Sequence, residues 1–192
     1  MAKLYFYYAS MNAGKSSTLL QTAFNYGERG MRVSLWTAAL DNRPGFGAIS
    51  SRIGLASDAH RYETDTDIET RVLADHAADP IACVLVDEAQ FLTRDQVWQL
   101  ARLADDAGIP VLCYGLRTDF QGELFTGSAS LLGIADALVE LKAVCDCGRK
   151  ATMNLRVDAQ GKAVREGAQT EIGGNDRYVA MCRRHFCEAL AG

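Results

Sequence analysis

An aromatic run followed by a glycine-lysine loop is the feature that most constrains the fold of this chain. Residues 3–8 read KLYFYY, residues 9–16 read ASMNAGKS, and helical character continues from Ser16 to Arg29, where the glycines of GERG end it. A strand, a tight loop and a helix in this order bring backbone N–H groups and the positive end of a helix dipole to one point. The segment therefore predicts an anion-binding unit at the start of an α/β domain.

The loop matches the phosphate-binding pattern G-x-x-x-x-G-K-[ST] except at its first position, which is Ala9. Gly14 would let the backbone approach the phosphates, Lys15 would neutralise the β- and γ-phosphates, and Ser16 would offer its hydroxyl to magnesium. A left-handed alanine would cost about 1–2 kcal/mol, so we expect Ala9 to end the strand with a negative φ. A solvated lysine at the start of an ordinary helix is the alternative. The predicted ATP-binding residues of the loop are Ala9, Ser10, Met11, Asn12, Ala13, Gly14, Lys15 and Ser16.

A second apolar run, IACVLVDE, ends in two acids, Asp87 and Glu88. Its continuous apolar character is typical of a parallel strand covered on both faces. Since ligands bind at the carboxyl ends of parallel strands, both acids are expected on the same edge of the sheet as Lys15. Phosphoryl transfer needs a metal-holding acid and a group that orients the attacking oxygen, and these positions provide both. For either acid alone, a solvated strand end is the alternative.

Further apolar runs alternate with helical segments along the chain. RVSLW, IPVLCYG and ALVELKA are candidate strands, DIETRVLADHAA is a candidate helix, and Thr93 and Gln96 have capping-box spacing before another helix. Residues 41–60 lack sustained periodicity and are expected to form a long loop. The pattern predicts an α/β fold, a mostly parallel sheet flanked by helices. Near residue 143 the alternation of apolar runs and helical segments gives way to paired cysteines and glycine-containing loops. This change predicts a main domain of residues 1–142 and a small C-terminal domain of residues 143–192.

Charge and hydropathy restrict the partners. The formal net charge of -4 provides no broad cationic field, which disfavours sequence-independent binding to nucleic acid or to an anionic membrane. No stretch reaches the roughly 18 apolar residues that span a bilayer. We therefore expect a cytoplasmic protein, whose six cysteines do not form a disulfide framework.

Four soft or borderline ligands occur in two short pairs. Cys145 and Cys147 form C-x-C, whereas Cys182 and His185 form C-x-x-H. Such a set suits a closed tetrahedral zinc site that holds the base of the intervening loop. Cys187 is a competing candidate for the fourth ligand. Cys83 and Cys113 lie in apolar strands and are expected to be buried, and neither His60 nor His76 has a partner suggested by the sequence.

Together, the motifs ASMNAGKS, DEAQF, CYGLRTDFQGELF, AVCDCGRKA and IGGNDRYVAMCRRH resemble those of the bacterial thymidine kinases that carry a zinc-binding lasso domain. The resemblance covers nearly the whole chain. It implies a RecA-like P-loop core that transfers the γ-phosphate of ATP to the 5′-hydroxyl of thymidine. In this resemblance Glu88 matches the general base, while Asp87 and Ser16 match the magnesium-holding residues. His185 is preferred over Cys187 because its spacing from Cys182 matches the family.

The same resemblance implies further site residues. It adds Asp41, Arg43, Asp87 and Gln90 to the ATP site, although an arginine in a loop is often only solvated. The implied thymidine-binding residues are Met11, Phe91, Leu116, Phe120, Asn154, Ile172, Gly173 and Tyr178. Aromatic and aliphatic walls suit a flat base that carries a methyl group. The alternatives are core packing for the apolar members, which the residues alone favour for Leu116, and a simple turn for Gly173 and Gly174.

Homotetramer formation and feedback inhibition by dTTP are also implied by the resemblance alone. Three other functions are each suggested by part of the sequence. A nucleic-acid-dependent ATPase is suggested by DEAQ, but a helicase normally needs a second motor domain. A GTPase lacks support because the chain has no N-K-x-D motif. A zinc-binding interaction module would leave the phosphate loop unexplained.

Overall fold

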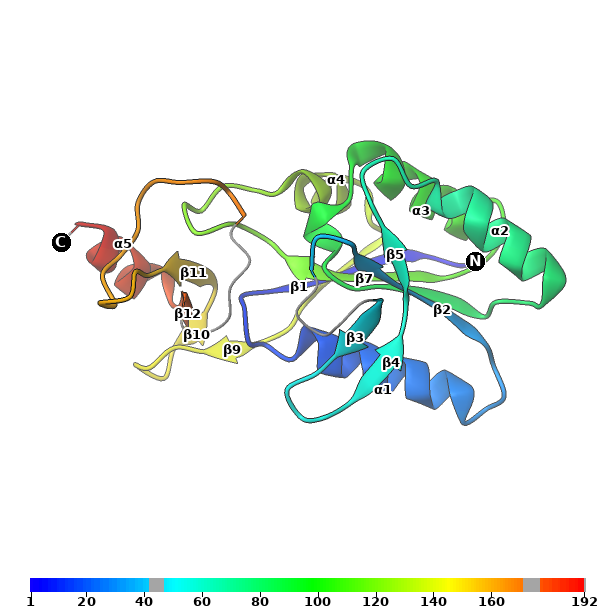
Figure 1. Cartoon of the computed structure of the whole chain (residues 1–192), viewed down its shortest axis with the longest axis horizontal. Helices are drawn as coiled ribbons and strands as arrows, with labels where there is room; N and C mark the ends of the chain where they lie inside the picture. The colour runs from blue at the N-terminus through cyan, green and yellow to red at the C-terminus, as the bar shows by residue number, and fades with distance from the viewer. Residues whose placement is uncertain (42–46, 171–176, 192) are drawn as a thin grey trace.

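A six-stranded parallel sheet forms the centre of the molecule (Figure 1). The structure, a computed structural model, describes residues 1–41, 47–170 and 177–191. All five pairs of neighbouring strands in this sheet run parallel. In spatial order the strands are β5 (His60–Tyr62), β2 (Val33–Ala38), β6 (Cys83–Val86), β7 (Val111–Leu116), β1 (Leu4–Ala9) and β8 (Ala137–Glu140). The mostly parallel sheet predicted from the sequence is thus confirmed.

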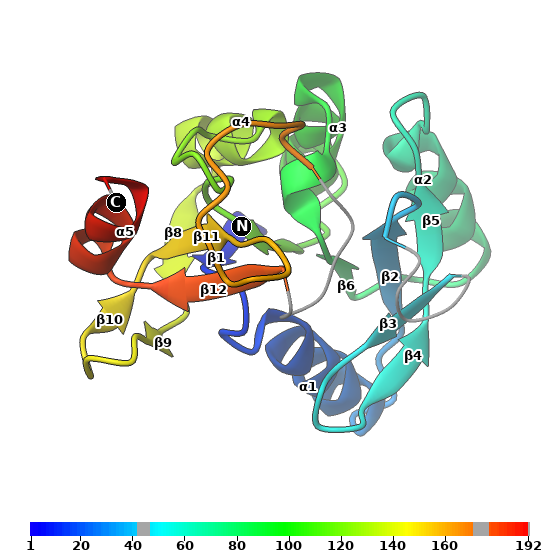
Figure 2. The same cartoon turned by 60° about the vertical axis from the view of Figure 1, so that its left-hand side comes forward.

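Helices cover both faces of the sheet, as the continuous apolar strands require. Val84 and Val86 pack against three helices on one face, whereas Cys83 and Leu85 pack with the first helix on the other. The three helices are α2 (Ile68–Ala78), α3 (Arg94–Asp105) and α4 (Thr126–Ile134), and the helix on the opposite face is α1 (Lys15–Gly27). Figure 2 shows these three helices above the sheet and α1 below it.

The start of α3 is fixed by the predicted capping box. The Thr93 hydroxyl accepts from the Gln96 N–H, and the Gln96 side chain accepts from the Thr93 N–H. The same Gln96 amide is 2 % exposed and donates to the carbonyls of Glu63 and Thr66. One side chain therefore caps α3 and also holds the segment that leads into α2.

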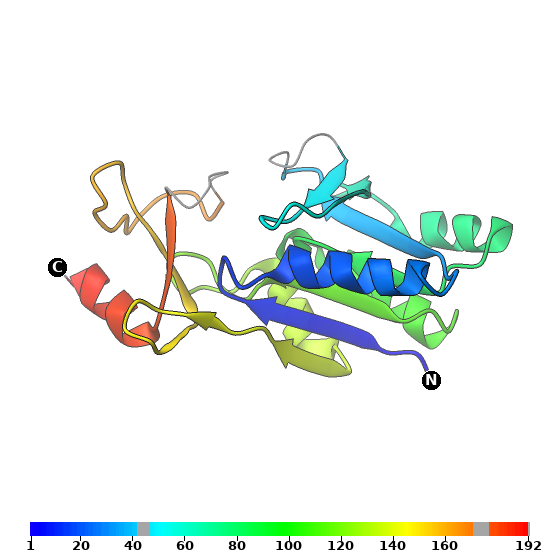
Figure 3. The ribbon, with the colours of Figure 1, turned by 90° about the horizontal axis from the view of Figure 1, so that it is seen from below.

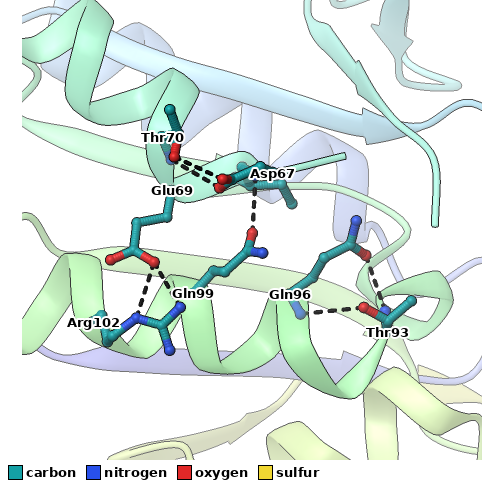
Figure 4. A network of polar contacts seen from close by, with 8 residues as sticks. Asp67, Glu69, Thr70, Thr93, Gln96, Gln99 and Arg102 are labelled. Atoms are coloured by element: carbon teal, nitrogen blue, oxygen red, sulfur yellow. Dashed lines mark hydrogen bonds and ion pairs between the residues drawn. The ribbon is translucent and has the colours of Figure 1, made fainter. Parts of the chain in front are cut away.

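Side chains also join α2 to α3 (Figure 4). Asp67 caps the beginning of α2, and the Gln99 amide oxygen of α3 accepts from the Ile68 N–H at 2.9 Å. Arg102 donates two hydrogen bonds to the Glu69 carboxylate. These contacts fix the two helices side by side on the sheet.

The expectation of a long loop over residues 41–60 is wrong for the described part of that segment. β3 (Ala48–Ser50) and β4 (Ala56–Asp58) form an antiparallel hairpin, and β5 begins at His60. Ile49 is 1 % exposed and packs with Leu19 and Leu20 of α1. A three-residue strand with one buried residue is too short to give a periodic signal, so tertiary packing decides it.

The remaining elements form a separate group at the end of the molecule toward which the sheet strands point (Figures 1 and 3). ALVELKA, expected as one strand, divides here because β8 ends at Glu140 and the next short strand pairs elsewhere. Neither α4 nor the C-terminal helix was predicted. No helix in the described ranges is long and apolar enough to cross a membrane. The elements are β9 (Ala143–Val144), β10 (Lys150–Ala151), β11 (Met153–Arg156), β12 (Tyr178–Met181) and α5 (Arg183–Ala191).

Candidate functional site

The phosphate loop connects β1 to α1 with the geometry expected of an anion site. Ala9 is the last residue of β1 and has no positive φ, which confirms the expectation that alanine fits there. The left-handed positions are Asn12, with φ 64°, and Gly14, with φ 77°. Asparagine and glycine tolerate this conformation best. Lys15 begins α1, so the positive end of the helix faces the loop.

A side-chain hydrogen bond joins the first turn of α1 to the residue that follows β6. The Ser16 hydroxyl donates to Asp87 Oδ2 at 2.8 Å, and Lys15 Nζ donates to the Ser10 carbonyl at 2.9 Å. Octahedral magnesium with bonds of about 2.1 Å places neighbouring oxygens about 3.0 Å apart. A hydroxyl and a carboxylate at this spacing therefore fit the ion. The sequence prediction that Asp87 lies at the same sheet edge as the loop is confirmed.

Asp87 is a buried carboxyl, only 5 % exposed. Desolvation, followed by repulsion from Glu88, raises its pKa to about 7. The hydrogen bond from Ser16 and the charge of Lys15 act in the opposite direction. A bound cation would favour the ionised form of Asp87. The buried position of Asp87 therefore suits a carboxylate that is ionised when it binds a metal ion.

Glu88 has an unusual backbone conformation, with φ 53° and ψ 34° in the left-handed region. Such strain costs of order 1–3 kcal/mol and persists only where surrounding contacts hold it. Here the buried Tyr62 hydroxyl donates to the Glu88 carbonyl at 2.8 Å, and the Glu88 N–H donates to Asp87 Oδ1 at 3.0 Å. Glu88 lines a cavity.

Gln90 holds the Glu88 side chain. It is 2 % exposed, its amide nitrogen donates to Glu88 Oε2, and its amide oxygen accepts from the Leu116 N–H at 3.0 Å. A Cβ on Gly115 would lie 2.9 Å from that amide oxygen, so glycine leaves room for Gln90. Although predicted for the ATP site, Gln90 makes these hydrogen bonds to the acid and to β7.

The loop and both acids line a single cavity of about 580 Å³. Aromatic and aliphatic residues line the same cavity. Phe91 and Phe125 meet edge to face with centroids 5.8 Å apart, Phe120 is 1 % exposed, and Leu116 is partly buried. The cavity therefore combines charged lining residues with apolar ones.

Two residues from the C-terminal group of strands complete the cavity wall. The Asn154 amide oxygen accepts from the Met11 N–H at 2.7 Å, and its amide nitrogen donates to the Thr118 carbonyl at 3.3 Å. The Tyr178 hydroxyl accepts from Arg156, whose guanidinium carbon lies 3.7 Å from the centroid of the Phe120 ring. Asn154 and Tyr178, both predicted as site residues, line the cavity.

The four predicted metal ligands are brought together at the base of these strands. The ligand atoms of Cys145, Cys147, Cys182 and His185 all lie within 4.8 Å of one another. Cys147 Sγ and Cys182 Sγ are 3.8 Å apart, and tetrahedral zinc with bonds of about 2.3 Å would require about 3.8 Å. The N–H groups of Cys147 and Cys182 lower the pKa of the Cys145 thiol to about 6, which favours a thiolate. The donor set therefore fits a metal ion such as zinc.

The predictions for the remaining cysteines, Cys187, Cys83 and Cys113, are also confirmed. Cys187 is exposed and lies outside the four-ligand cluster, whereas Cys83 and Cys113 are buried in strands. All six cysteines are free thiols, as expected without a disulfide framework.

A family model described as thymidine kinase matches residues 2–186. The chain belongs to the thymidine kinase family. A thymidine kinase of Novosphingobium aromaticivorans is 76% identical over 99% of both chains. Relatives with the same name from Zymomonas mobilis and Jannaschia sp. are 60% and 59% identical, each over 99% of this chain and 98% or 97% of their own.

For this thymidine kinase family member, the structure places the predicted loop residues in two groups. Met11 to Ser16 line the cavity, whereas Ala9 and Ser10 are buried. Asp41 also lines the cavity, beside residues of the β3–β4 hairpin. Three predicted residues, Arg43, Ile172 and Gly173, lie outside the described part of the chain.

Sequence reasoning missed several residues of the kinase cavity. Phe125 and Gln169 line it, as does Asp119, which is 4 % exposed and accepts from the Gln169 side chain. Phe125 is the last residue of the motif CYGLRTDFQGELF, so the motif is a signal by which it can be found. Tyr62 gave no local signal, because only the packing of β5 brings its hydroxyl to Glu88.

Proposed function

We propose that the protein is a thymidine kinase that transfers the γ-phosphate of ATP to the 5′-hydroxyl of thymidine, giving dTMP and ADP. One observation carries the proposal: a single cavity of about 580 Å³ is lined by the phosphate loop, by Glu88 and by aromatic walls. A donor phosphate and a flat apolar acceptor can therefore meet in one space. Family membership supports thymidine as that acceptor.

The charged end of the cavity is the proposed ATP site. Loop N–H groups and the positive end of α1 face the phosphates, and Lys15 neutralises their charge. Asp41 and Gly14 border the same space, which supports their assignment to ATP. Ser16 and Asp87 are the residues that would hold Mg²⁺, which supplies charge neutralisation on the phosphates when bound. Gln90 and Arg43 complete the proposed set.

Glu88 is the proposed general base. It lines the same cavity as the phosphate loop and the aromatic residues, and Gln90 donates a hydrogen bond to one of its carboxylate oxygens. From there it can accept the proton of the 5′-hydroxyl as that oxygen attacks the γ-phosphate in line. Gln90 then acts as an orienting residue as well as a cavity residue. Positioning of the reactants and neutralisation of charge account for most of the proposed rate enhancement, since phosphoryl transfer requires little covalent chemistry from the protein.

The apolar end is the proposed thymidine site. Phe91, Leu116, Phe120 and Phe125 provide walls for the pyrimidine ring, and the thymine methyl adds apolar area to bury. Tyr178, Asn154 and Met11 border the same end. Ile172 and Gly173 are proposed to complete the site, and their support is the sequence resemblance alone.

Zinc is the proposed occupant of the cluster of Cys145, Cys147, Cys182 and His185. The closed set of four ligands suits a structural ion, which would hold β9, β10 and β12 together. We further propose a domain boundary at residues 142 and 143. Separate apolar clusters on the two sides of this boundary support it.

Three more features are proposed. A cytoplasmic location is proposed because six cysteines that form no disulfide suit a reducing compartment. The homotetramer and feedback inhibition by dTTP rest on the sequence resemblance. A dTTP molecule would place its base at the apolar end and its phosphates toward the donor site, without any role for nucleic acid.

The test is an assay with labelled ATP, magnesium and thymidine, run with and without RNA. We expect labelled dTMP whose formation requires thymidine and does not change with RNA. ATP hydrolysis that RNA stimulates, without any dTMP, would refute the proposal and favour the ATPase.

A further inference from the structure

We propose that Asn154 is a positioning residue that ties the phosphate loop to the C-terminal strands that carry the cysteine cluster, so that a metal ion bound at that cluster tightens nucleotide binding. The inference rests on the proposed function, because it assumes that the loop binds ATP. It assigns Asn154 a second task beyond bordering the thymidine end of the cavity. Neither task requires contact with the transferred phosphate.

The orientation of the Asn154 amide is fixed by its partners. One partner, the Met11 N–H, can only donate, and the other, the Thr118 carbonyl, can only accept. The amide oxygen must therefore face Met11, at 2.7 Å, and the amide nitrogen must face Thr118, at 3.3 Å. With only 2 % of its surface exposed, Asn154 has little water to replace either bond. The side chain thus bridges β11, the phosphate loop and the segment that follows β7.

A second contact joins the same two regions. The Ser10 hydroxyl donates to the Ala151 carbonyl at 3.2 Å, and this bond is buried. Ala151 lies in β10 and Asn154 lies three residues beyond it in β11. Two successive strands of the C-terminal group therefore hold two consecutive residues of the loop, Ser10 and Met11.

The strands that make these contacts also carry the cysteine cluster. Ala151 pairs with Ala143 of β9, and Cys145 follows that strand directly. Asn154 pairs with Ala180 of β12, and Cys182 follows β12 directly. A metal that joins Cys145 to Cys182 would fix the two strand ends, and through them Asn154 and Ala151.

The position of the Met11 N–H matters because Met11 precedes the left-handed Asn12 and borders the cavity. A phosphate loop binds through the fixed directions of its backbone N–H groups. If the loop loses its anchors, it must be ordered again whenever nucleotide binds, and this cost weakens affinity. The structure therefore links a distant ligand cluster to the ATP site through two side-chain contacts.

The experiment compares wild type, Asn154→Ala, Ser10→Ala and the control Asp158→Ala. Asp158 accepts from the N–H groups of Gln160 and Lys162 in an exposed turn after β11, so its loss disturbs the C-terminal strands without touching the loop. The probe is the fluorescent ATP analogue mant-ATP with magnesium and without thymidine. Each protein is measured as purified and after removal of bound metal, with metal content, circular dichroism and thermal unfolding recorded in parallel.

We expect Asn154→Ala to raise the dissociation constant for mant-ATP about five- to tenfold, as the loss of one buried hydrogen bond implies. Asp158→Ala should bind like wild type. Metal removal should weaken binding by a similar factor in wild type but by less than about twofold in Asn154→Ala, because its anchor is already lost. If Asn154→Ala does not fold, Ser10→Ala carries the same comparison through the second contact.

Unchanged affinity in folded Asn154→Ala, with only a lower melting temperature, would overturn the inference and leave Asn154 a stabilising residue. Equal weakening of wild type and Asn154→Ala on metal removal would also overturn it. If wild type itself does not bind mant-ATP, the proposed function fails instead, so the two failures can be distinguished.

Discussion

The Ser16 hydroxyl donates to the Asp87 carboxylate at 2.8 Å, joining residues 71 positions apart. One residue belongs to the first turn of α1 and the other directly follows β6, so the bond joins the phosphate loop to the strand that carries the acids. The buried position of Asp87 lowers the stability of the protein when the carboxyl is ionised, since burial opposes the ionised form.

Asp87→Asn is expected to stabilise the magnesium-free protein near pH 8 while impairing catalysis. Because burial raises the Asp87 pKa to about 7, its favourable contribution to folding is complete below the unfolded pKa of about 4 and is lost as pH rises through about 7. The stability of the asparagine variant lacks this dependence on pH. Between pH 5 and pH 8 the melting temperature of the wild type should therefore fall more than that of the variant. Equal falls in the two melting temperatures would show that burial of Asp87 does not cause the pH dependence.

Glu88→Gln should reduce kcat by about 10²- to 10⁴-fold, the range for loss of a general base. Glutamine keeps the size of the side chain and removes its ability to accept a proton. Mant-ATP affinity should stay close to that of wild type, because the proposed role is on the acceptor side of the cavity. A near-normal kcat would show that another group removes the proton.

Tyr62→Phe should lower kcat severalfold and destabilise the protein by about 1 kcal/mol. The ring remains, but the hydroxyl that holds the Glu88 carbonyl is lost, and the strained turn can relax. Tyr114→Phe is the matched control, since Tyr114 is also buried and its hydroxyl lies 3.4 Å from the Thr22 hydroxyl in the other apolar cluster. Equal kcat in both variants would argue against a positioning role for Tyr62.

Gly127→Ala should destabilise the protein and reduce activity. A Cβ on Gly127 would lie 2.5 Å from the Ala89 carbonyl oxygen, and backbone there cannot move without shifting the turn after Glu88. Gly133→Ala in the same helix is the control, because its Cβ meets no atom within 4 Å. That variant should gain about 0.5–1 kcal/mol from reduced backbone freedom. Similar melting temperatures for the two variants would contradict close packing at Gly127.

Cys147→Ser should lower the zinc content and the melting temperature together. Serine keeps the size of the side chain but is a much poorer ligand for zinc than a thiolate. Metal analysis of the purified protein should give close to one zinc per wild-type chain and less in the variant. A metal-free wild type whose fold survives chelation would rule out structural zinc.

Local sequence signals predicted much of the fold and of the site. The apolar strands, the capping box at Thr93 and the phosphate loop each depend on neighbouring residues, so they could be identified from the sequence. Ala9 is an example, since a strand end needs no left-handed residue and alanine fits there. The C-x-C and C-x-x-H pairs likewise predicted a metal site, the family resemblance favoured His185 over Cys187, and the structure brings the four ligands together.

The missed features depend on contacts between distant residues. The β3–β4 hairpin exists because Ile49 is buried against α1, and no periodicity in three residues could show this. The sequence by itself determined the types of groups: a phosphate loop, two acids, aromatic residues and four metal ligands. Only tertiary structure decided that Tyr62 holds Glu88 and that Asn154 holds Met11, across 26 and 143 residues. Such bonds leave no local pattern, because their partners meet only after the sheet and the C-terminal strands have packed.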